Sequence, residues 1–149
     1  MTSTVSKKED ALKFHDAYLT EMSSNLQENF EPKYEDDLFD LDIETRVYVD
    51  KSESVLVEDE KLGIFRVFLK FGVRWLRDRS VVEDEKEICA TIESEFVAEY
   101  IINAPLDQKY LDDFALNNVI ADVWPYWREL LTSQCSRMHL TGVKLPILT

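Results

Sequence analysis

The sequence predicts an α+β fold in which an antiparallel four-stranded β-sheet is followed by two C-terminal helices packed on one of its faces. Two patterns support this prediction. Apolar and polar residues alternate over much of the first two thirds of the chain, and beyond Pro105 the apolar residues recur every three or four positions. The 149 residues are enough for one hydrophobic core, so residues 1–149 are expected to form a single domain.

Four strands are expected, over residues 13–26, 39–49, 65–77 and 88–102. The first is ambiguous, because its aromatic residues also fit a helix at a spacing of four, but its Thr and Ser residues favour a strand. Residues 51–61 are polar and acidic, so we expect a surface connection there. The third strand is the clearest, since its apolar residues occupy every second position: Phe65, Val67, Leu69, Phe71, Val73 and Trp75.

Two helices are expected after Pro105. Asp107 is placed to cap the first, whose apolar positions run from Leu111 to Ile120. Pro125 suits the first turn of the second helix, which Gly142 ends. One face of this second helix is more apolar than a sheet needs for cover, so we expect part of it to bury against another subunit: Trp124, Trp127, Leu131, Cys135 and Met138.

The formal charge is strongly negative, with a net value of −13. Nucleic acid and anionic lipid are therefore not expected as ligands, because both would be repelled. The basic residues concentrate in one segment, residues 61–79, between two acidic ones. We expect ion pairs across the sheet, joining Arg66, Lys70, Arg74 and Arg77 to Asp40, Asp42, Glu44, Glu93 or Glu95.

The sequence also indicates a location in the cell. No stretch approaches the roughly 20 apolar residues that cross a bilayer, and residues 1–10 lack the apolar centre of a secretory signal. A cytoplasmic protein without direct membrane insertion is expected. In that compartment Cys89 and Cys135 are expected to be free thiols.

No catalytic pattern is present. The sequence has no nucleophile elbow, phosphate-binding loop or dinucleotide fingerprint. Adjacent acids such as Asp112 and Asp113 are expected to be solvated, because neighbouring side chains point in different directions. His15 and His139 lack partners at the spacing of metal ligands. We therefore expect no enzyme, no cofactor and no metal site.

The C-terminal third carries a specific motif. Residues 124–130 read W-P-Y-W-R-E-L, followed by Ser136-Arg137 and an apolar segment at residues 143–147. Upstream, residues 39–43 read F-D-L-D-I and residues 92–96 read I-E-S-E-F. In this order the elements resemble the protein-export chaperone family SecB, over nearly the whole chain.

The resemblance implies a SecB-like homotetramer, built as a dimer of dimers, which holds unfolded polypeptides without ATP. Such preproteins are then handed to the translocase motor SecA, and Glu21 and Glu93 match family acids that contact its zinc-bearing C-terminal tail. The groove for clients is expected to be lined or bordered by apolar residues from three segments: Phe30, Tyr34, Phe39, Leu41, Ile43, Leu140, Val143, Leu145 and Ile147.

Two other functions stay open. The SecB-like family includes chaperones that protect an antitoxin rather than serve export, and sequence alone does not choose the client. A different class is an acidic interaction protein without chaperone activity, such as a nucleic-acid mimic that blocks a basic enzyme site. The net charge of −13 is the feature that favours this last reading.

Overall fold

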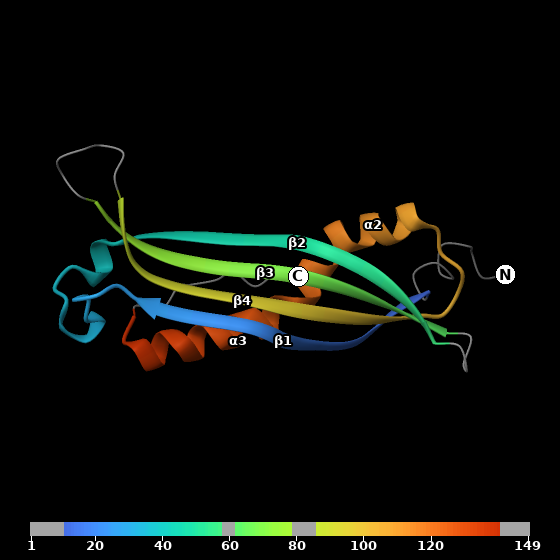
Figure 1. Cartoon of the computed structure of the whole chain (residues 1–149), viewed down its shortest axis with the longest axis horizontal. Coiled ribbons are helices and arrows are strands. Elements are labelled where there is room, and N and C mark those ends of the chain that lie inside the picture. The colour runs from blue at the N-terminus through green and yellow to red at the C-terminus, as the bar shows by residue number, and fades with distance from the viewer. Residues whose placement is uncertain (1–10, 58–61, 79–85, 141–149) are drawn as a thin grey trace.

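The computed structural model describes residues 11–57, 62–78 and 86–140. Four long strands form one antiparallel sheet: β1 (Leu12–Leu26), β2 (Asp42–Val57), β3 (Leu62–Asp78) and β4 (Lys86–Ile102). Their order in the sheet is β1-β4-β3-β2, so β1 and β2 are the two edges. Helices α2 (Gln108–Asn117) and α3 (Val119–Met138) lie on one face, behind the sheet in Figure 1. The α+β prediction is confirmed.

The core lies between β3, β4 and the helices. All six apolar residues of the alternating pattern in β3 are at most 2% exposed. They share one face of the sheet with Ala90, Ile92, Phe96 and Ala98, their cross-strand partners on β4. Because side chains alternate between faces, Arg66, Lys70 and Arg74 fall on the opposite face, which we call the open face, whereas Arg77 lies on the same face as the core residues.

Helix α3 packs on the sheet through contacts between aromatic rings. The ring of Phe71 stacks on Trp127 of α3 at 5.3 Å and meets the edge of Phe96 at 5.8 Å. In the first turn of α3, the buried Tyr100 hydroxyl donates a hydrogen bond of 2.6 Å to a carboxylate oxygen of Asp122, and burial raises the pKa of Tyr100. These contacts fix α3 obliquely across β4 and β3.

The predicted strands are found, with one substantial error. β2 begins at Asp42 rather than at residue 39, and it continues to Val57. The expected surface connection over residues 51–61 is therefore wrong for residues 51–57, which pair with β3, and residues 58–61 lie outside the described ranges. The reason is that β2 is an edge strand with mostly exposed side chains, so it tolerates a polar sequence that lacks clear alternation.

The boundary between the two helices differs from the predicted one. Asp107 caps α2 as expected, its side chain accepting a hydrogen bond from the amide of Tyr110 at 2.8 Å. The break comes after Asn117, and α3 starts at Val119, so Pro125 lies inside the helix rather than in its first turn. Buried Val119 and Val123 hold the chain helical upstream of the proline. His139 in the left-handed conformation, with φ of 56°, ends α3; Gly142 lies outside the described residues.

No helix among the residues that the structure describes is long and apolar enough to span a membrane.

Candidate functional site

The connection between β1 and β2 has to cross the sheet. Because these strands are opposite edges, residues 27–41 run across one end of the sheet, at the left in Figure 1. We call them the crossing segment. Asn29, with φ of 67°, turns the chain at its start. Two short 3-10 helices follow, Pro32–Tyr34 and Leu38–Asp40.

Arg77 fastens the crossing segment to β3. Its guanidinium donates two hydrogen bonds to the carboxylate of Asp37, at 2.8 and 2.9 Å, and lies 3.5 Å from Glu35 and 5.5 Å from the ring centre of Phe30. The hydrogen bonds from Arg77 hold the pKa of Asp37 below its usual range. The pKa of Asp37 is lower in the folded than in the unfolded protein. The pair therefore stabilises the fold at pH values above the usual carboxylate pKa, and this stabilisation is lost as pH falls through the lowered pKa.

The crossing segment displays apolar side chains while it buries others. Tyr34 is 72% exposed, Phe39 is 90% exposed, and Ile43 at the start of β2 is 41% exposed. Phe30 and Leu41 are only 5% and 8% exposed and act as anchors in the core. The segment thus presents two aromatic rings on a backbone that is held from beneath.

The predicted client residues therefore fall into three sets. Tyr34, Phe39 and Ile43 are accessible and lie within one stretch of chain. Three others belong to the core of the single chain: Phe30, Leu41 and Leu140, the last 6% exposed. The remaining three, Val143, Leu145 and Ile147, lie outside the described residues.

A second apolar surface was not predicted. Phe14, Leu19 and Leu26 of β1 are 37 to 41% exposed, and their partners on β4 belong to the face that carries the helices. Tyr126 of α3, 39% exposed, lies beside Phe14 with 6.4 Å between ring centres. These four residues form the β1 strip, which α3 leaves partly uncovered. The sequence signal was the apolar content of residues 14–26, which we read only as strand-forming.

The stripe on α3 packs inside the chain. Trp124, Trp127, Leu131 and Cys135 are 1 to 8% exposed and belong to the core cluster, against which the partly buried Met138 also packs. Their side chains have little surface left to offer another subunit. The sheet needed this cover because the inner face of β3 is apolar along most of its length.

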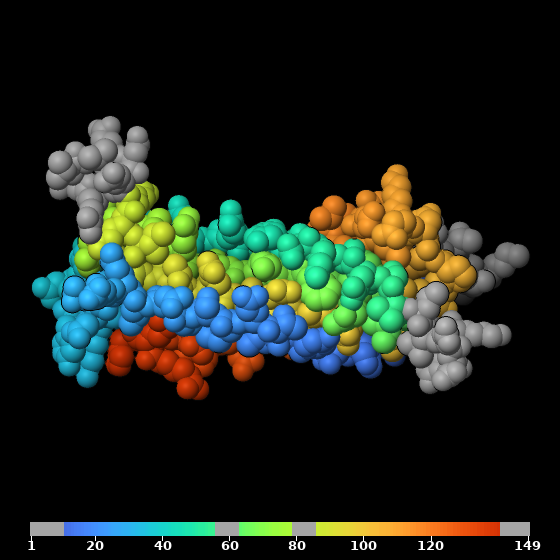
Figure 2. Space-filling model, viewed as in Figure 1, coloured from blue at the N-terminus to red at the C-terminus, as the bar shows by residue number. Residues whose placement is uncertain are grey.

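The open face carries a network of opposite charges. Arg74 pairs with Glu44 at 2.7 Å and Lys70 with Glu95 at 3.8 Å, as the sequence predicts. Arg66 instead pairs with Glu53 at 2.6 Å and Glu99 at 3.1 Å. Arg77 lies on the other face, which carries the helices, and pairs with Asp37 and Glu35 rather than with the predicted acids. No described helix lies over this face, which Figure 2 shows in space-filling form.

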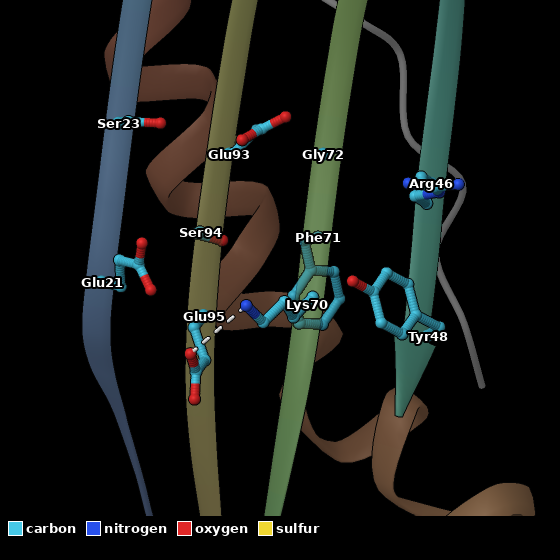
Figure 3. Close-up of a pocket in the computed structure, with 10 residues that line it drawn as sticks. All are labelled: Glu21, Ser23, Arg46, Tyr48, Lys70, Phe71, Gly72, Glu93, Ser94 and Glu95. Atoms are coloured by element: carbon cyan, nitrogen blue, oxygen red, sulfur yellow. Dashed lines mark ion pairs between the residues drawn. The ribbon is translucent and has the colours of Figure 1, made fainter. Parts of the chain in front are cut away.

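Glu21 and Glu93 come together on the open face. Both are exposed, and both line a hollow of about 250 Å³ that Gly72 also lines. Glu95 lines the same side of the hollow, while Arg46, Tyr48 and Lys70 line the other (Figure 3). The resemblance named two acids of this hollow, and the charge pattern placed Lys70 near them. Arg46 was missed, because it lies on β2, which sequence spacing alone does not place near the two acids.

The fold has a relative among solved structures. The chain is similar to the SecB-like chaperone Rv1957 of Mycobacterium tuberculosis, in complex with a ChAD peptide from the Rv1956 HigA1 antitoxin. The two share 16% identity with a TM-score of 0.70, over 97% of this chain and 95% of that one. A protein of unknown function from Streptococcus agalactiae, 10% identical over 91% and 96% of the two chains, has a TM-score of only 0.37 and carries no argument. No family model and no curated protein sequence matches.

The chain therefore has a SecB-like fold. The four-stranded antiparallel sheet followed by one helix in two joined pieces is the shared architecture. This confirms, for the fold, the resemblance that the sequence motifs indicate.

Loss of Arg77 should loosen the crossing segment. In Arg77→Gln both hydrogen bonds to Asp37 disappear, so we expect amide hydrogens of residues 27–41 to exchange about tenfold faster while β3 stays protected. Hydrogen exchange followed by mass spectrometry measures this. Arg74→Gln is the matched control, because it breaks an ion pair on the same strand that does not involve the crossing segment. Equal exchange in both variants would show that Arg77 does not fasten the segment.

Proposed function

We propose that this protein is a SecB-like holdase chaperone that binds extended polypeptide segments without ATP and serves a dedicated client of the antitoxin type. The observation that carries the proposal is the likeness over 97% of the chain to a SecB-like chaperone whose structure holds an antitoxin peptide. The exposed aromatic residues of the crossing segment support it, because several exposed apolar side chains in one region of a surface mark a site of protein binding, and these two rings are 72% and 90% exposed.

The client surface is proposed to consist of Tyr34, Phe39 and Ile43. An extended segment lying against them gains from apolar burial, at roughly 25 cal/mol per Å², without needing a particular sequence. The anchors beneath, Phe30 and Leu41, keep the rings presented before a client arrives. Binding then loses little entropy on the chaperone side.

Removal of the two exposed rings should weaken client binding. For Tyr34→Ser with Phe39→Ser we expect the Kd for a fluorescently labelled, reduced and unfolded polypeptide to rise at least tenfold, because each buried ring contributes about 1.5–3 kcal/mol. Fluorescence anisotropy in low and in moderate salt measures this, and the wild-type Kd should change little with salt.

The matched control is Leu116→Ser, which removes an exposed side chain of α2 that is 65% exposed. It should bind clients as the parent does and suppress aggregation equally well. If the ring variant binds as tightly as this control, the client surface lies elsewhere. If the wild type neither binds the polypeptide nor suppresses aggregation, the acidic interaction protein without chaperone activity becomes the better reading.

General preprotein export with transfer to SecA is the second candidate function. The observation in its favour is that Glu21 and Glu93, matched to SecA-contacting acids by the resemblance, are both exposed and line one hollow. Their charges would steer a basic partner, and such steering is screened with a Debye length of about 8 Å at physiological ionic strength. This role uses the open face, on the side of the sheet away from the helices.

A peptide from the SecA C-terminal tail tests the export role. We expect Glu21→Lys with Glu93→Lys to abolish its binding to the protein at low salt, while suppression of aggregation stays unchanged. Isothermal titration calorimetry at two salt concentrations measures this. An absence of binding by the wild type at low salt would remove the export role and leave the dedicated-client role in place.

The functional unit is proposed to be a cytoplasmic homotetramer. The tetramer is what the resemblance to SecB implies, and the β1 strip, an apolar surface on a free sheet edge, supports pairing of two copies within it. The stripe on α3 is buried by the chain itself. A second copy is the simplest cover for such an edge, because pairing also satisfies its unpaired backbone groups.

Charges placed in the β1 strip should break the assembly. For Leu19→Glu with Leu26→Glu we expect a smaller species than the wild type by light scattering coupled to size-exclusion chromatography, because carboxylates resist burial in an apolar contact. Leu116→Glu, on α2, should leave the mass unchanged. A wild type that is monomeric at micromolar concentration would refute the assembly.

A further inference from the structure

Gly72 stands in the middle of β3 without a structural reason. Its φ lies outside the left-handed region that favours glycine. A Cβ built there would lie 3.7 Å from Cγ of Glu93 and 4.0 Å from the carbonyl oxygen of Ile92, which are ordinary contacts. Glycine inside a strand costs about 0.5–1 kcal/mol relative to alanine. Glycine inside a strand often marks a bulge, a tight bend or a place where a ligand or another backbone approaches closely. No register shift falls at Gly72, so close approach from the open face is the reason that we consider.

Opposite charges flank this glycine. In the sheet Gly72 is paired with Glu93 on β4 and with Arg46 on β2, so the three residues form one row across the strands. The two charged residues are separated by two strand spacings, about 10 Å between backbones. Figure 3 shows the Glu93 carboxylate extending from β4 toward the position of Gly72. The glycine thus leaves a gap between an acid and a base.

The row at Gly72 differs from its neighbours. Lys70 is paired with Glu95 in one adjacent row, and Arg74 with Glu44 in the other. Within the described part of the chain neither Glu93 nor Arg46 forms an ion pair, and the Arg46 guanidinium lies 5.7 Å from the ring centre of Tyr48. Two complementary charges are therefore held apart, both accessible from the open face.

We propose that the hollow at Gly72 is a docking site for a partner polypeptide segment that presents one basic and one acidic side chain together. The basic group fits beside Glu21 and Glu93, and the acidic group fits beside Arg46, whose guanidinium binds carboxylates in a fork. The proposal rests on the proposed role of Glu21 and Glu93 in binding a partner. It differs in the partner segment, which carries an acidic side chain as well as a basic one.

A polypeptide is the occupant, rather than a small molecule, because of the shape of the hollow. It is a hollow of about 250 Å³ on an exposed sheet face, which is smaller than the roughly 300–1,000 Å³ of small-molecule sites that bury most of their ligand. A partner protein can rest on the surrounding strands and insert only its side chains. Arg46 then supplies selectivity, since it repels a segment that carries basic groups alone.

Three octapeptides test the proposal on the full chain. Each is acetylated and amidated, with the same Ser and Thr background; one carries Lys and Glu two positions apart, one carries Lys and Gln, and one carries Gln and Glu. Residues two apart in an extended peptide point to the same side, about 7 Å apart. Binding is followed by the amide resonance of Gly72, which is readily assigned because the chain has only three glycines.

We expect the Lys–Glu peptide to bind about fivefold more tightly than either singly charged peptide, the scale of an exposed ion pair. Arg46→Gln should abolish the difference between the Lys–Glu and Lys–Gln peptides. Lys51→Gln is the matched control, because Lys51 lies on the same strand over the ring of Phe68 and outside the hollow; it should keep the difference.

Filling the hollow is the independent test. Gly72→Leu should remove binding of all three peptides, and Gly72→Ala, whose Cβ has room, should weaken the Lys–Glu peptide while circular dichroism stays native. The proposal is overturned if the Gly72 resonance responds to none of the peptides in the wild type, or if the Lys–Gln peptide binds as tightly as the Lys–Glu peptide. Client binding through Tyr34 and Phe39 is measured separately and does not depend on either result.

Discussion

The placement of β1 and β2 at opposite edges of the sheet is the constraint on which the other features depend. Consecutive strands usually pair, but here the first two are separated by the full width of the sheet. The chain must cross one end, and the crossing segment has too little core beneath it to bury all its aromatic residues. Arg77, Phe30 and Leu41 hold it down, while Tyr34 and Phe39 stay in water.

The strict alternation in β3 gives the sheet two faces with different chemistry. One face is apolar and is covered mostly by α3. The other face, the open face, carries paired charges and has a hollow at Gly72, where the row of charged residues on β3 is interrupted. Binding through apolar contacts on the crossing segment would depend little on salt concentration, whereas binding through charges on the open face would weaken strongly as salt rises. The client surface and the partner surface that we propose therefore lie on different parts of one small domain and depend on different physical interactions.

Alternation and helical spacing predicted the elements well, because period alone distinguishes a half-buried strand from a helix. The far half of β2 was missed since an edge strand needs no apolar face, and the start of α3 was misplaced since burial of Val119 outweighs the signal of Pro125. The client residues stay a prediction, and the structure adds only which of them are exposed. Exposure separated Phe39 from Leu41, two positions away, and only tertiary structure reveals that difference. The Arg77–Asp37 contact joins residues 40 positions apart and leaves no local pattern.

Arg66 ties all four strands together. Its guanidinium, on β3, bonds to Glu53 on β2, Glu99 on β4 and the hydroxyl of Tyr18 on β1, at distances from 2.6 to 3.1 Å. A change at any one of these positions leaves the other three with an incomplete network, so their effects on stability are not additive. Substitutions at the four positions should therefore arise jointly among related chains, and loss of the arginine should be accompanied by loss of the acids that it neutralises.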